Sequence, residues 1–225
     1  MTRRIFVALI FGLGGVAILA GLGVWQVQRL GWKQSVIADL EQRLGADPAW
    51  LPEAPTEARD EYLRVAVTGA YSQGELHVLT SARPWGPGFR VIAPFETAQG
   101  RRILVDRGYV PQTEKDAPRT LPAGPVTGAL LWPNETDGFT PAPDPDANIW
   151  FARDTALMAA ALGTEPVMLV AETPPPAAEW PAPQPVSVNL PNDHLEYAIT
   201  WFSLCAIWAG MTVALVLRLR RKGEV

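Results

Sequence analysis

The chain has 225 residues, enough for one domain of moderate size together with membrane segments. Its formal net charge is −4 at pH 7, and its mean hydropathy of +0.06 averages two apolar ends and a polar middle. No Lys/Arg run occurs outside the termini, so the chain lacks a basic surface for nucleic acid, and that class of partner is excluded. The single cysteine, Cys205, lies in the second apolar segment, so the middle domain can hold no disulfide and no cysteine metal site.

The first apolar segment covers residues 5–24, which carry no charge. The apolar region of a signal peptide has about 7 to 15 residues, so this longer stretch is predicted to be a transmembrane helix. Gly14, Ala17 and Gly21 share one face of that helix and are expected to let a second helix approach closely.

Residues 25–44 are predicted to extend this helix out of the membrane, because apolar residues keep a near-helical spacing as far as Leu44. Trp25, Arg29 and Trp32 fall on one face, where Arg29 can stack on an indole. Aromatic and basic side chains at this position are typical of an interfacial anchor that sets the depth of a helix.

Residues 45–173 are predicted to form a β-rich (α+β) domain, folded as a sandwich or a partly closed barrel. From residue 61 the apolar pattern changes from the helical period to a period of two. Gln99-Gly100 is predicted to be a hairpin turn. Short strands are expected at residues 61–68, 75–80, 89–95, 102–110, 126–132, 149–153 and 167–170.

Two further segments complete this domain. Residues 154–162 predict its one strong helix, with Asp154 as the cap. Residues 174–193, rich in proline, predict a stiff extended linker that leads back to the membrane.

The middle domain shows no catalytic constellation: it contains no nucleophile elbow, no phosphate-binding glycine loop and no cluster of His, Asp and Glu. His77 stands alone in a predicted strand, which is typical of a surface or packed histidine. Asp106 and Arg107 are adjacent on a strand and so point to opposite faces, which favours salt bridges with other partners. The chain is not expected to be an enzyme.

The second apolar segment, residues 194–217, is predicted to be another transmembrane helix, because no charge occurs from Tyr197 to Leu217. Pro191 precedes it, Asp193 is a suitable N-cap, and Glu196 can complete a capping box.

Basic residues at both ends of the chain indicate its orientation. Residues 1–4 contain two arginines, and residues 218–225 contain three arginines and a lysine. By the positive-inside rule both termini are cytoplasmic, and the central domain lies on the opposite side. In a bacterium this topology predicts a multi-pass protein of the inner membrane with a periplasmic domain.

One stripe on the second apolar helix combines a histidine with aromatic residues at spacings of three or four: His194, Tyr197, Trp201, Leu204 and Trp208. Such stripes usually pack against other helices or lie at the membrane interface. The alternative is a site for a flat metal-centred macrocycle, with His194 as the axial iron ligand and Tyr197 and Trp201 as its walls. A cleft beside Trp25 and Trp32 is expected to receive the His194 imidazole. The residues by themselves leave both interpretations open.

Short motifs spread along the whole chain share one resemblance, and the most specific is Asn-x-His-Leu-x-Tyr-x-x-Thr-Trp-Phe at residues 192–202. Together they resemble the Surfeit-locus (Surf/Shy-type) family of cytochrome c oxidase assembly proteins. Tyr109 stands where the family more often has Trp, and Cys205 where it tends to have a small residue. The other matching positions are Gly23, Trp25, Gln26, Arg29, Trp32, Lys33, 62–65, 88–91, Pro94, Phe95, 105–111 and 148–151.

The resemblance implies a non-catalytic role: helping haem a to reach the large catalytic subunit of a terminal oxidase. For bacterial members it also implies haem a binding with His194 as the iron ligand. The expected partners are that catalytic subunit, haem a synthase and the lipid bilayer. The alternative is a haem-free scaffold that holds oxidase subunits together. The cofactor-binding residues predicted for the first role are His194, Tyr197, Trp201, Trp25, Trp32 and Arg29.

Overall fold

The structure is a computed structural model that describes residues 3–173, 180–188 and 190–221. The chain divides into two compact units, Met1–Asp39 with Val188–Val225 and Leu40–Ser187, and each is described by itself. Part of the predicted linker, residues 174–179, and the end of the predicted basic tail, from residue 222, lie outside the described residues.

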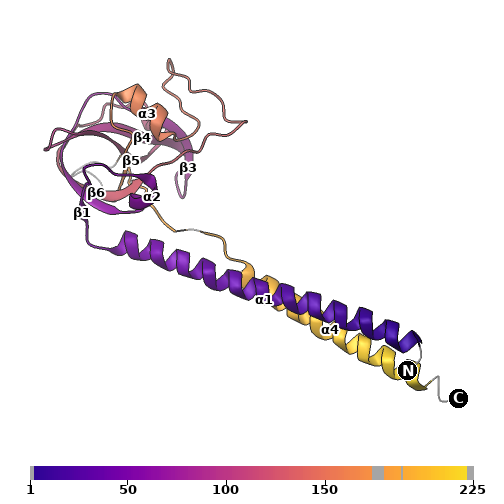
Figure 1. Cartoon of the computed structure of the whole chain (residues 1–225). Helices are drawn as coiled ribbons and strands as arrows, with labels where there is room; N and C mark the ends of the chain where they lie inside the picture. The colour runs from indigo at the N-terminus through magenta and orange to yellow at the C-terminus, as the bar shows by residue number, and fades with distance from the viewer. Residues whose placement is uncertain (1–2, 174–179, 189, 222–225) are drawn as a thin grey trace. The chain divides into compact units, whose positions relative to one another are not determined.

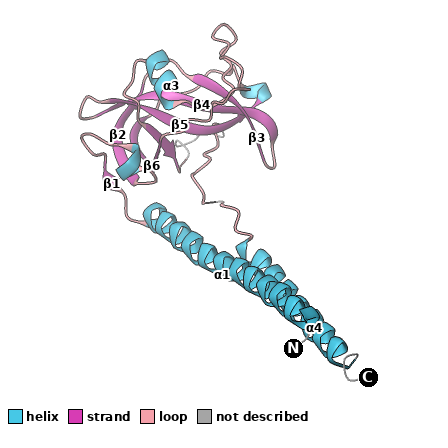
Figure 2. Ribbon diagram, turned by 45° about the vertical axis from the view of Figure 1, so that its right-hand side comes forward, coloured by secondary structure: helices cyan, strands magenta, loops and turns pink. Residues whose placement is uncertain are grey.

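The first unit is a helical hairpin formed by α1 (Arg3–Gly45) and α4 (His194–Arg221), which lie side by side in Figures 1 and 2. The predicted extension of the first helix to Leu44 is confirmed, because α1 continues to Gly45. Both helices are long and apolar enough to cross a bilayer. Only 11% of the most apolar window of α1, and 0% of that of α4, is buried. These exposed apolar faces are consistent with a membrane protein.

Glycines let α1 approach α4, but they are not the predicted ones. A Cβ added at Gly12, Gly15 or Gly23 would collide with a side chain of α4, namely Thr212, Trp208 and Phe202 respectively. A Cβ at Gly14 or Gly21 would meet nothing within 4 Å. The predicted face of Gly14, Ala17 and Gly21 is therefore wrong. The bulky side chains of α4 decide which glycines are needed, and the spacing of small residues in α1 alone does not reveal their positions.

The second unit is a β-barrel (Figure 2). Within the described residues, seven strands form one sheet in the order β1-β2-β6-β7-β5-β4-β3, and β2 also pairs with β4. This extra pairing closes β2, β6, β7, β5 and β4 into a five-stranded barrel, which decides between the two architectures that the sequence left open. The strands are β1 (Ala49–Trp50), β2 (Arg64–Tyr71), β3 (Leu76–Ala82), β4 (Gly86–Thr97), β5 (Arg102–Pro111), β6 (Ala123–Leu131) and β7 (Met168–Ala171).

The barrel closes where β2 changes partners. β2 pairs with β6 from Arg64 to Ala70, and from Gly69 it also pairs with β4. A Cβ at Gly69 would collide with the carbonyl oxygen of Glu96 on β4. Glycine at this position therefore permits the close backbone approach that closes the barrel.

Alternate side chains fill the barrel, as the period of two predicts. Val65 and Val67 of β2, Ile103 and Val105 of β5, and Leu169 of β7 are all buried in one cluster. The Gln99-Gly100 turn between β4 and β5 is confirmed: Gly100 has φ +79°, and the Thr97 nitrogen donates to the Arg101 carbonyl oxygen at 2.8 Å.

A second apolar cluster packs β3 and α3 (Thr155–Leu162) against the outside of the barrel. Met158 of α3 is fully buried there with Ile92, Leu104 and Met168. The predicted cap is confirmed, because the Asp154 carboxylate accepts a hydrogen bond from the Leu157 nitrogen. Two short helical turns, α2 (Glu57–Asp60) and η1 (Gln112–Glu114), complete the unit.

The strand predicted at residues 149–153 does not form. Ile149 and Trp150 make only isolated bridges, to Asp144 and Val78. Asn148 has φ +49°, which turns the chain directly before this segment. The segment therefore meets the edge of β3 at one residue and then leaves it.

Residues 180–187 of the predicted proline-rich linker belong to the barrel unit. Ala182 and Tyr109 exchange backbone hydrogen bonds of 2.7 and 2.8 Å, and Arg90 donates to the carbonyl oxygen of Gln184. Gly108 has φ +109° and leaves no room for a Cβ beside Ala182. β5 thus gains one more backbone pairing at its end.

The glycine packing gives a test of the hairpin. Gly15→Ala should lower the stability of the hairpin by about 1–3 kcal/mol, because the new methyl group overpacks against Trp208. Gly14→Ala is the matched control, and should leave the stability unchanged or raise it by up to about 1 kcal/mol through helix propensity. The measurement is unfolding of the purified full chain with increasing SDS, followed by tryptophan fluorescence. Equal losses in both variants would contradict this packing.

Candidate site at the start of the second apolar helix

His194 lies in the first turn of α4, where the hairpin holds it against α1. Its Nδ1 atom lies 2.8 Å from the Oε1 atom of Gln26, whose side chain is only 7% exposed. The Nζ atom of Lys33 donates to the carbonyl oxygen of Pro191. These two hydrogen bonds hold the N-terminal end of α4 against residues 26–33 of α1.

The Gln26 contact selects one form of the imidazole. An amide oxygen can only accept a hydrogen bond, so Nδ1 of His194 carries the proton in this contact. In the neutral ring Nε2 then keeps its lone pair and can act as a metal ligand. A partner on one ring nitrogen that orients the other is the usual arrangement around metal-binding histidines.

The aromatic residues predicted around His194 have different environments. Trp208 packs against Gly15, and its Nε1 atom donates to the carbonyl oxygen of Gly12 at 3.1 Å, so it serves the helix contact. Tyr197 is 55% exposed and Trp201 is half-buried. Among the described residues, neither side chain forms a ring contact with another aromatic residue.

Trp25 and Trp32 are each about half exposed, at 53% and 52%. The predicted stacking of Arg29 is present, with its guanidinium carbon 3.9 Å from the centroid of the Trp32 ring. In the described part of the chain, no ring contact joins His194 to either indole. The structure therefore brings Gln26, rather than an aromatic ring, directly to the imidazole.

An apolar groove of about 370 Å³ runs along the same hairpin, lined by Gly15, Ile18, Leu19, Leu204, Ile207, Trp208 and Met211. Ile18, Trp25 and Trp32 are spaced two helical turns apart on α1, as Leu204 and Tyr197 are on α4. The groove and these aromatic residues thus share one side of the hairpin. That side presents a continuous apolar and aromatic surface, with His194 near one end.

Gln26 was not predicted as a site residue, although it belongs to one of the matching motifs. The available signal is its position: an amide follows directly after the first apolar segment, on a helix whose neighbours are apolar or aromatic. A buried amide requires a hydrogen-bond partner. Only the pairing of the two helices shows that this partner is His194.

Cys205 faces α1, with its Sγ atom 3.6 Å from the carbonyl oxygen of Val16. No group of three or more His, Cys, Asp and Glu side chains suited to a metal ion occurs among the described residues. A metal held by several protein side chains therefore finds no site in that part of the chain, whereas a haem iron needs only one or two axial ligands.

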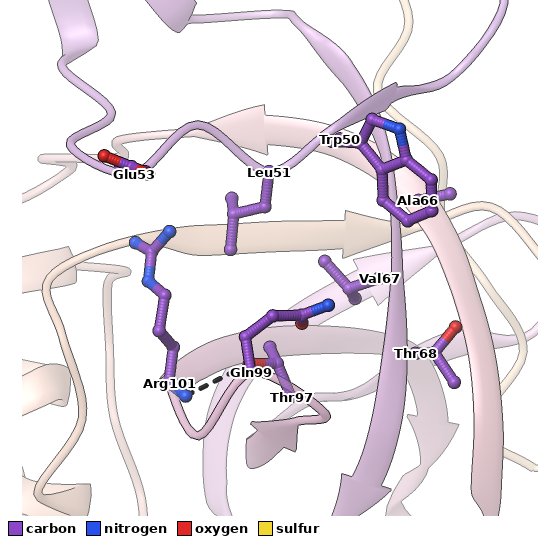
Figure 3. A pocket seen from close by; sticks show the side chains of 9 residues that line it. All are labelled: Trp50, Leu51, Glu53, Ala66, Val67, Thr68, Thr97, Gln99 and Arg101. Atoms are coloured by element: carbon purple, nitrogen blue, oxygen red, sulfur yellow. Dashed lines mark hydrogen bonds between the residues drawn. The ribbon is translucent and has the colours of Figure 1, made fainter.

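A pocket of about 390 Å³ lies in the barrel unit beside β1 and the β4–β5 turn (Figure 3). Trp50 stands at its edge with 82% of its surface exposed. Arg101, the one arginine of its lining, is paired with Glu165 at 2.6 Å and also contacts the carbonyl oxygen of Pro52. Since that charge is already neutralised, the pocket offers no free cation to an anionic ligand.

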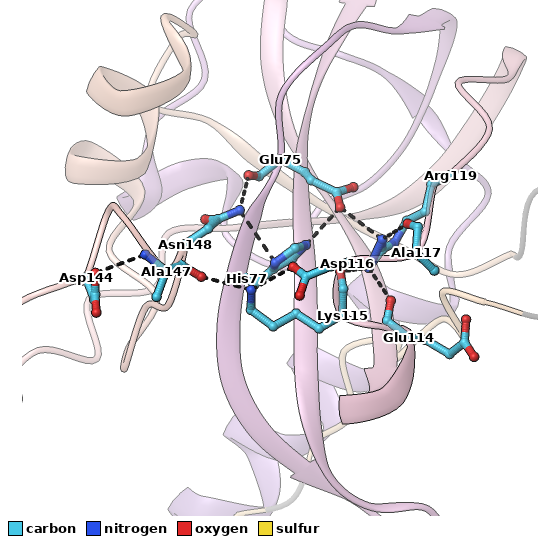
Figure 4. Close-up of polar contacts among 10 residues, drawn as sticks. All are labelled: Glu75, His77, Glu114, Lys115, Asp116, Ala117, Arg119, Asp144, Ala147 and Asn148. Carbon is cyan, nitrogen blue, oxygen red and sulfur yellow. Dashed lines mark hydrogen bonds and ion pairs between the residues drawn. The ribbon is translucent and has the colours of Figure 1, made fainter.

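His77 is a packed histidine, one of the two expected alternatives. It is 4% exposed, its Nε2 atom lies 2.8 Å from Glu75, and its Nδ1 atom faces the Asn148 amide (Figure 4). Arg119 pairs with the same Glu75 carboxylate at 3.1 Å. Both ring nitrogens thus face protein partners, and the cluster joins β3 to two neighbouring loops.

Asp106 and Arg107 point in different directions, as predicted. The Asp106 carboxylate is 0% exposed and pairs with Arg90 at 2.9 Å and Arg153 at 3.4 Å. The Arg107 guanidinium lies 4.6 Å from the Tyr71 ring and donates to the carbonyl oxygen of Thr120. Burial lowers the pKa of Arg107. These contacts are structural ion pairs and stacking, not a catalytic pair.

Comparison with known proteins gives one consistent result. The sequence profile of the SURF1 family matches residues 13–206. Surfeit locus protein 1 of Xenopus tropicalis is 35% identical to this chain over 82% of the chain and 68% of its own length, and the human protein of that name is 36% identical over 83% and 70%. A SURF1-like protein of Monosiga brevicollis is 35% identical over 90% of the chain and 84% of its own length.

The Glu75 cluster predicts a pH-dependent stability. Burial raises the pKa of Glu75, but the hydrogen bond from His77 and the charge of Arg119 outweigh it, so the pKa lies below its ordinary value. The ionised carboxylate therefore stabilises the fold above the ordinary pKa of about 4.3, and this contribution is lost as the pH falls through the lower, folded-state pKa.

Glu75→Gln should destabilise the barrel unit by about 1–3 kcal/mol at pH 7, with a smaller difference from the parent below about pH 4. Thermal unfolding of the full chain, followed by circular dichroism at several pH values, measures this effect. Glu57→Gln, which changes an exposed carboxylate, should match the parent throughout. A deficit of Glu75→Gln that is the same at every pH would refute the role of the charge.

Proposed function

Because the chain belongs to the SURF1 family, we propose that it is an assembly factor for cytochrome c oxidase that acts by binding rather than by catalysis. In this role it binds haem a and aids its insertion into the catalytic subunit of the oxidase. The partners are that subunit and, upstream, haem a synthase.

The observation that carries the haem proposal is the 2.8 Å contact between Gln26 Oε1 and His194 Nδ1. With Nδ1 occupied by this contact, Nε2 of His194 is the ring nitrogen left for a haem iron. The donor set also fits, because haem requires one strong axial ligand and an apolar surround rather than a cluster of side-chain ligands. Haem a supplies the redox-active iron porphyrin that the mature oxidase needs.

The exposed aromatic surface supports the same proposal. Tyr197 and Trp201 lie one and two turns beyond His194 on α4, and Trp25 and Trp32 lie on the same side of α1. Flat rings of this kind can cover a porphyrin face, and burial of apolar surface stabilises binding by about 25 cal/mol per Å². The stacked Arg29 supplies a positive charge near this surface for an anionic ligand group.

A haem-free scaffold is the second candidate, and exposed aromatic residues on the barrel unit favour it. Trp50 is 82% exposed and Phe139 is 96% exposed, so this unit presents apolar side chains that a partner protein can bury. In such a scaffold the hairpin and the barrel hold oxidase subunits during assembly, and His194 only fastens α4 to α1.

We further propose that the protein resides in the bacterial inner membrane, with α1 and α4 as its two spans. Arg3 and Arg4 begin one span, and Arg218, Arg220 and Arg221 end the other. This distribution favours cytoplasmic termini and a periplasmic barrel unit.

Haem binding is tested by the absorption spectrum of the full chain purified from cells that make haem a. His194→Ala should fold and insert but lose the haem band, and Trp201→Ala should weaken and shift it. Gln26→Leu should reduce haem affinity roughly 10- to 100-fold, because Nδ1 loses the acceptor that orients the ring. Gln28→Leu, an exposed amide on the same helix, is the matched control and should bind haem normally.

An unchanged haem a content and spectrum in His194→Ala would show that this residue is not the ligand, and would favour the scaffold. Absence of haem a from the parent chain would refute the chaperone mechanism. Recovery of the oxidase subunit by affinity purification is expected for both candidates and does not separate them.

The topology is tested with alkaline phosphatase fusions, since this enzyme is active only outside the cytoplasm. A fusion after Lys115 in the barrel unit should be active, and a fusion after Val225 should be inactive. The reverse pattern would invert the proposed orientation.

A further inference from the structure

The end of the hairpin that is farthest from His194 contains a second cavity. It has a volume of about 600 Å³ and lies between the start of α1 and the end of α4. Its lining combines two arginines with apolar side chains: Arg3, Arg4, Val7, Ala8, Leu215 and Leu219.

The charges that the described residues carry at this end are all of one sign. Among the described residues, the first two turns of α1 and the last two turns of α4 carry five arginines and no carboxylate. Arg3 and Arg4 are exposed, and neither forms an ion pair with another described residue. The lining of the cavity thus includes two guanidinium groups that no described carboxylate neutralises, and these can bind an anion.

The remaining lining residues of the cavity are apolar, unlike the two arginines. Val7, Ala8, Leu215 and Leu219 present only hydrocarbon, so a free inorganic anion would leave this surface uncovered. A ligand that covers both parts must have a negative head and a long apolar tail. Guanidinium groups bind phosphate through paired N–H donors, which makes a phosphate head the best match.

We propose that this cavity is a binding site for one anionic phospholipid. The phosphate lies on Arg3 and Arg4, and an acyl chain lies along the floor formed by Val7, Ala8, Leu215 and Leu219. The site uses the membrane setting proposed for the hairpin, but no residue of the haem site. α4 has 28 residues, so at about 1.5 Å per residue the two sites lie at opposite ends of the helix.

General attraction between the basic ends of a membrane protein and anionic lipids is the competing explanation. It would act through all five arginines, whereas the cavity involves only two of them. Arg220 and Arg221 are exposed and do not line the cavity, so their replacement makes a control with the same change of charge.

The test is native mass spectrometry of the full chain in a mild non-ionic detergent, with equal amounts of phosphatidylglycerol and phosphatidylcholine that carry the same acyl chains. The orientation in the membrane does not affect this measurement. The parent should retain one phosphatidylglycerol in roughly tenfold preference to phosphatidylcholine. The double variant Arg3→Gln/Arg4→Gln should lose this preference, and Arg220→Gln/Arg221→Gln should keep it.

A third variant, Leu215→Trp, fills the floor without a change of charge and should displace the lipid. Equal loss of preference in both double variants would overturn the proposal in favour of general electrostatic attraction. Retention of the lipid by Leu215→Trp would overturn the acyl-chain site and leave a headgroup contact only. A parent chain with no preference would also refute the proposal, while leaving the haem measurement unaffected.

Discussion

Every backbone N–H and C=O group that leaves water needs a hydrogen-bond partner, and both units of this protein depend on that constraint. In the hairpin the two long helices satisfy it internally, so their apolar faces can stay exposed without leaving backbone groups unpaired. In the other unit the strands satisfy it by closing on one another, since β2 finds β4 as a second neighbour from Gly69 onward. The backbone hydrogen bonds between Tyr109 and Ala182 likewise give the end of β5 a partner.

Buried polar side chains follow the same rule, and each unit contains buried polar side chains that are paired with named partners. Asp106 is held by two arginines in the barrel unit, and Glu75 by His77 and Arg119. In the hairpin the corresponding pair is Gln26 with His194. In the first two sets the carboxylates and both ring nitrogens of His77 face protein partners. The third leaves Nε2 of His194 without a structural task among the described residues, and for this reason it supports a ligand site.

The two proposed sites divide the hairpin by chemistry. The end that carries His194 offers one imidazole nitrogen and exposed aromatic rings, and these suit a porphyrin. The end that carries Arg3 and Arg4 offers two cations that no described carboxylate pairs with, together with apolar side chains, and these suit a lipid phosphate. Neither proposed site needs a nucleophile or a general base, in keeping with the proposed role in binding.

The sequence by itself determined what depends on local patterns: the two apolar helices, the extension to residue 44, the Asp154 cap, the Gln99-Gly100 turn and most strands, because periodicity and capping are properties of neighbouring residues. It also singled out His194. Only the tertiary structure decided barrel over sandwich, the failure of residues 149–153 to form a strand, and the set of glycines that contact α4. The same holds for the Gln26 partner of His194. These features depend on which residues meet across long separations in the chain, and this is fixed by the shapes of the side chains that pack together.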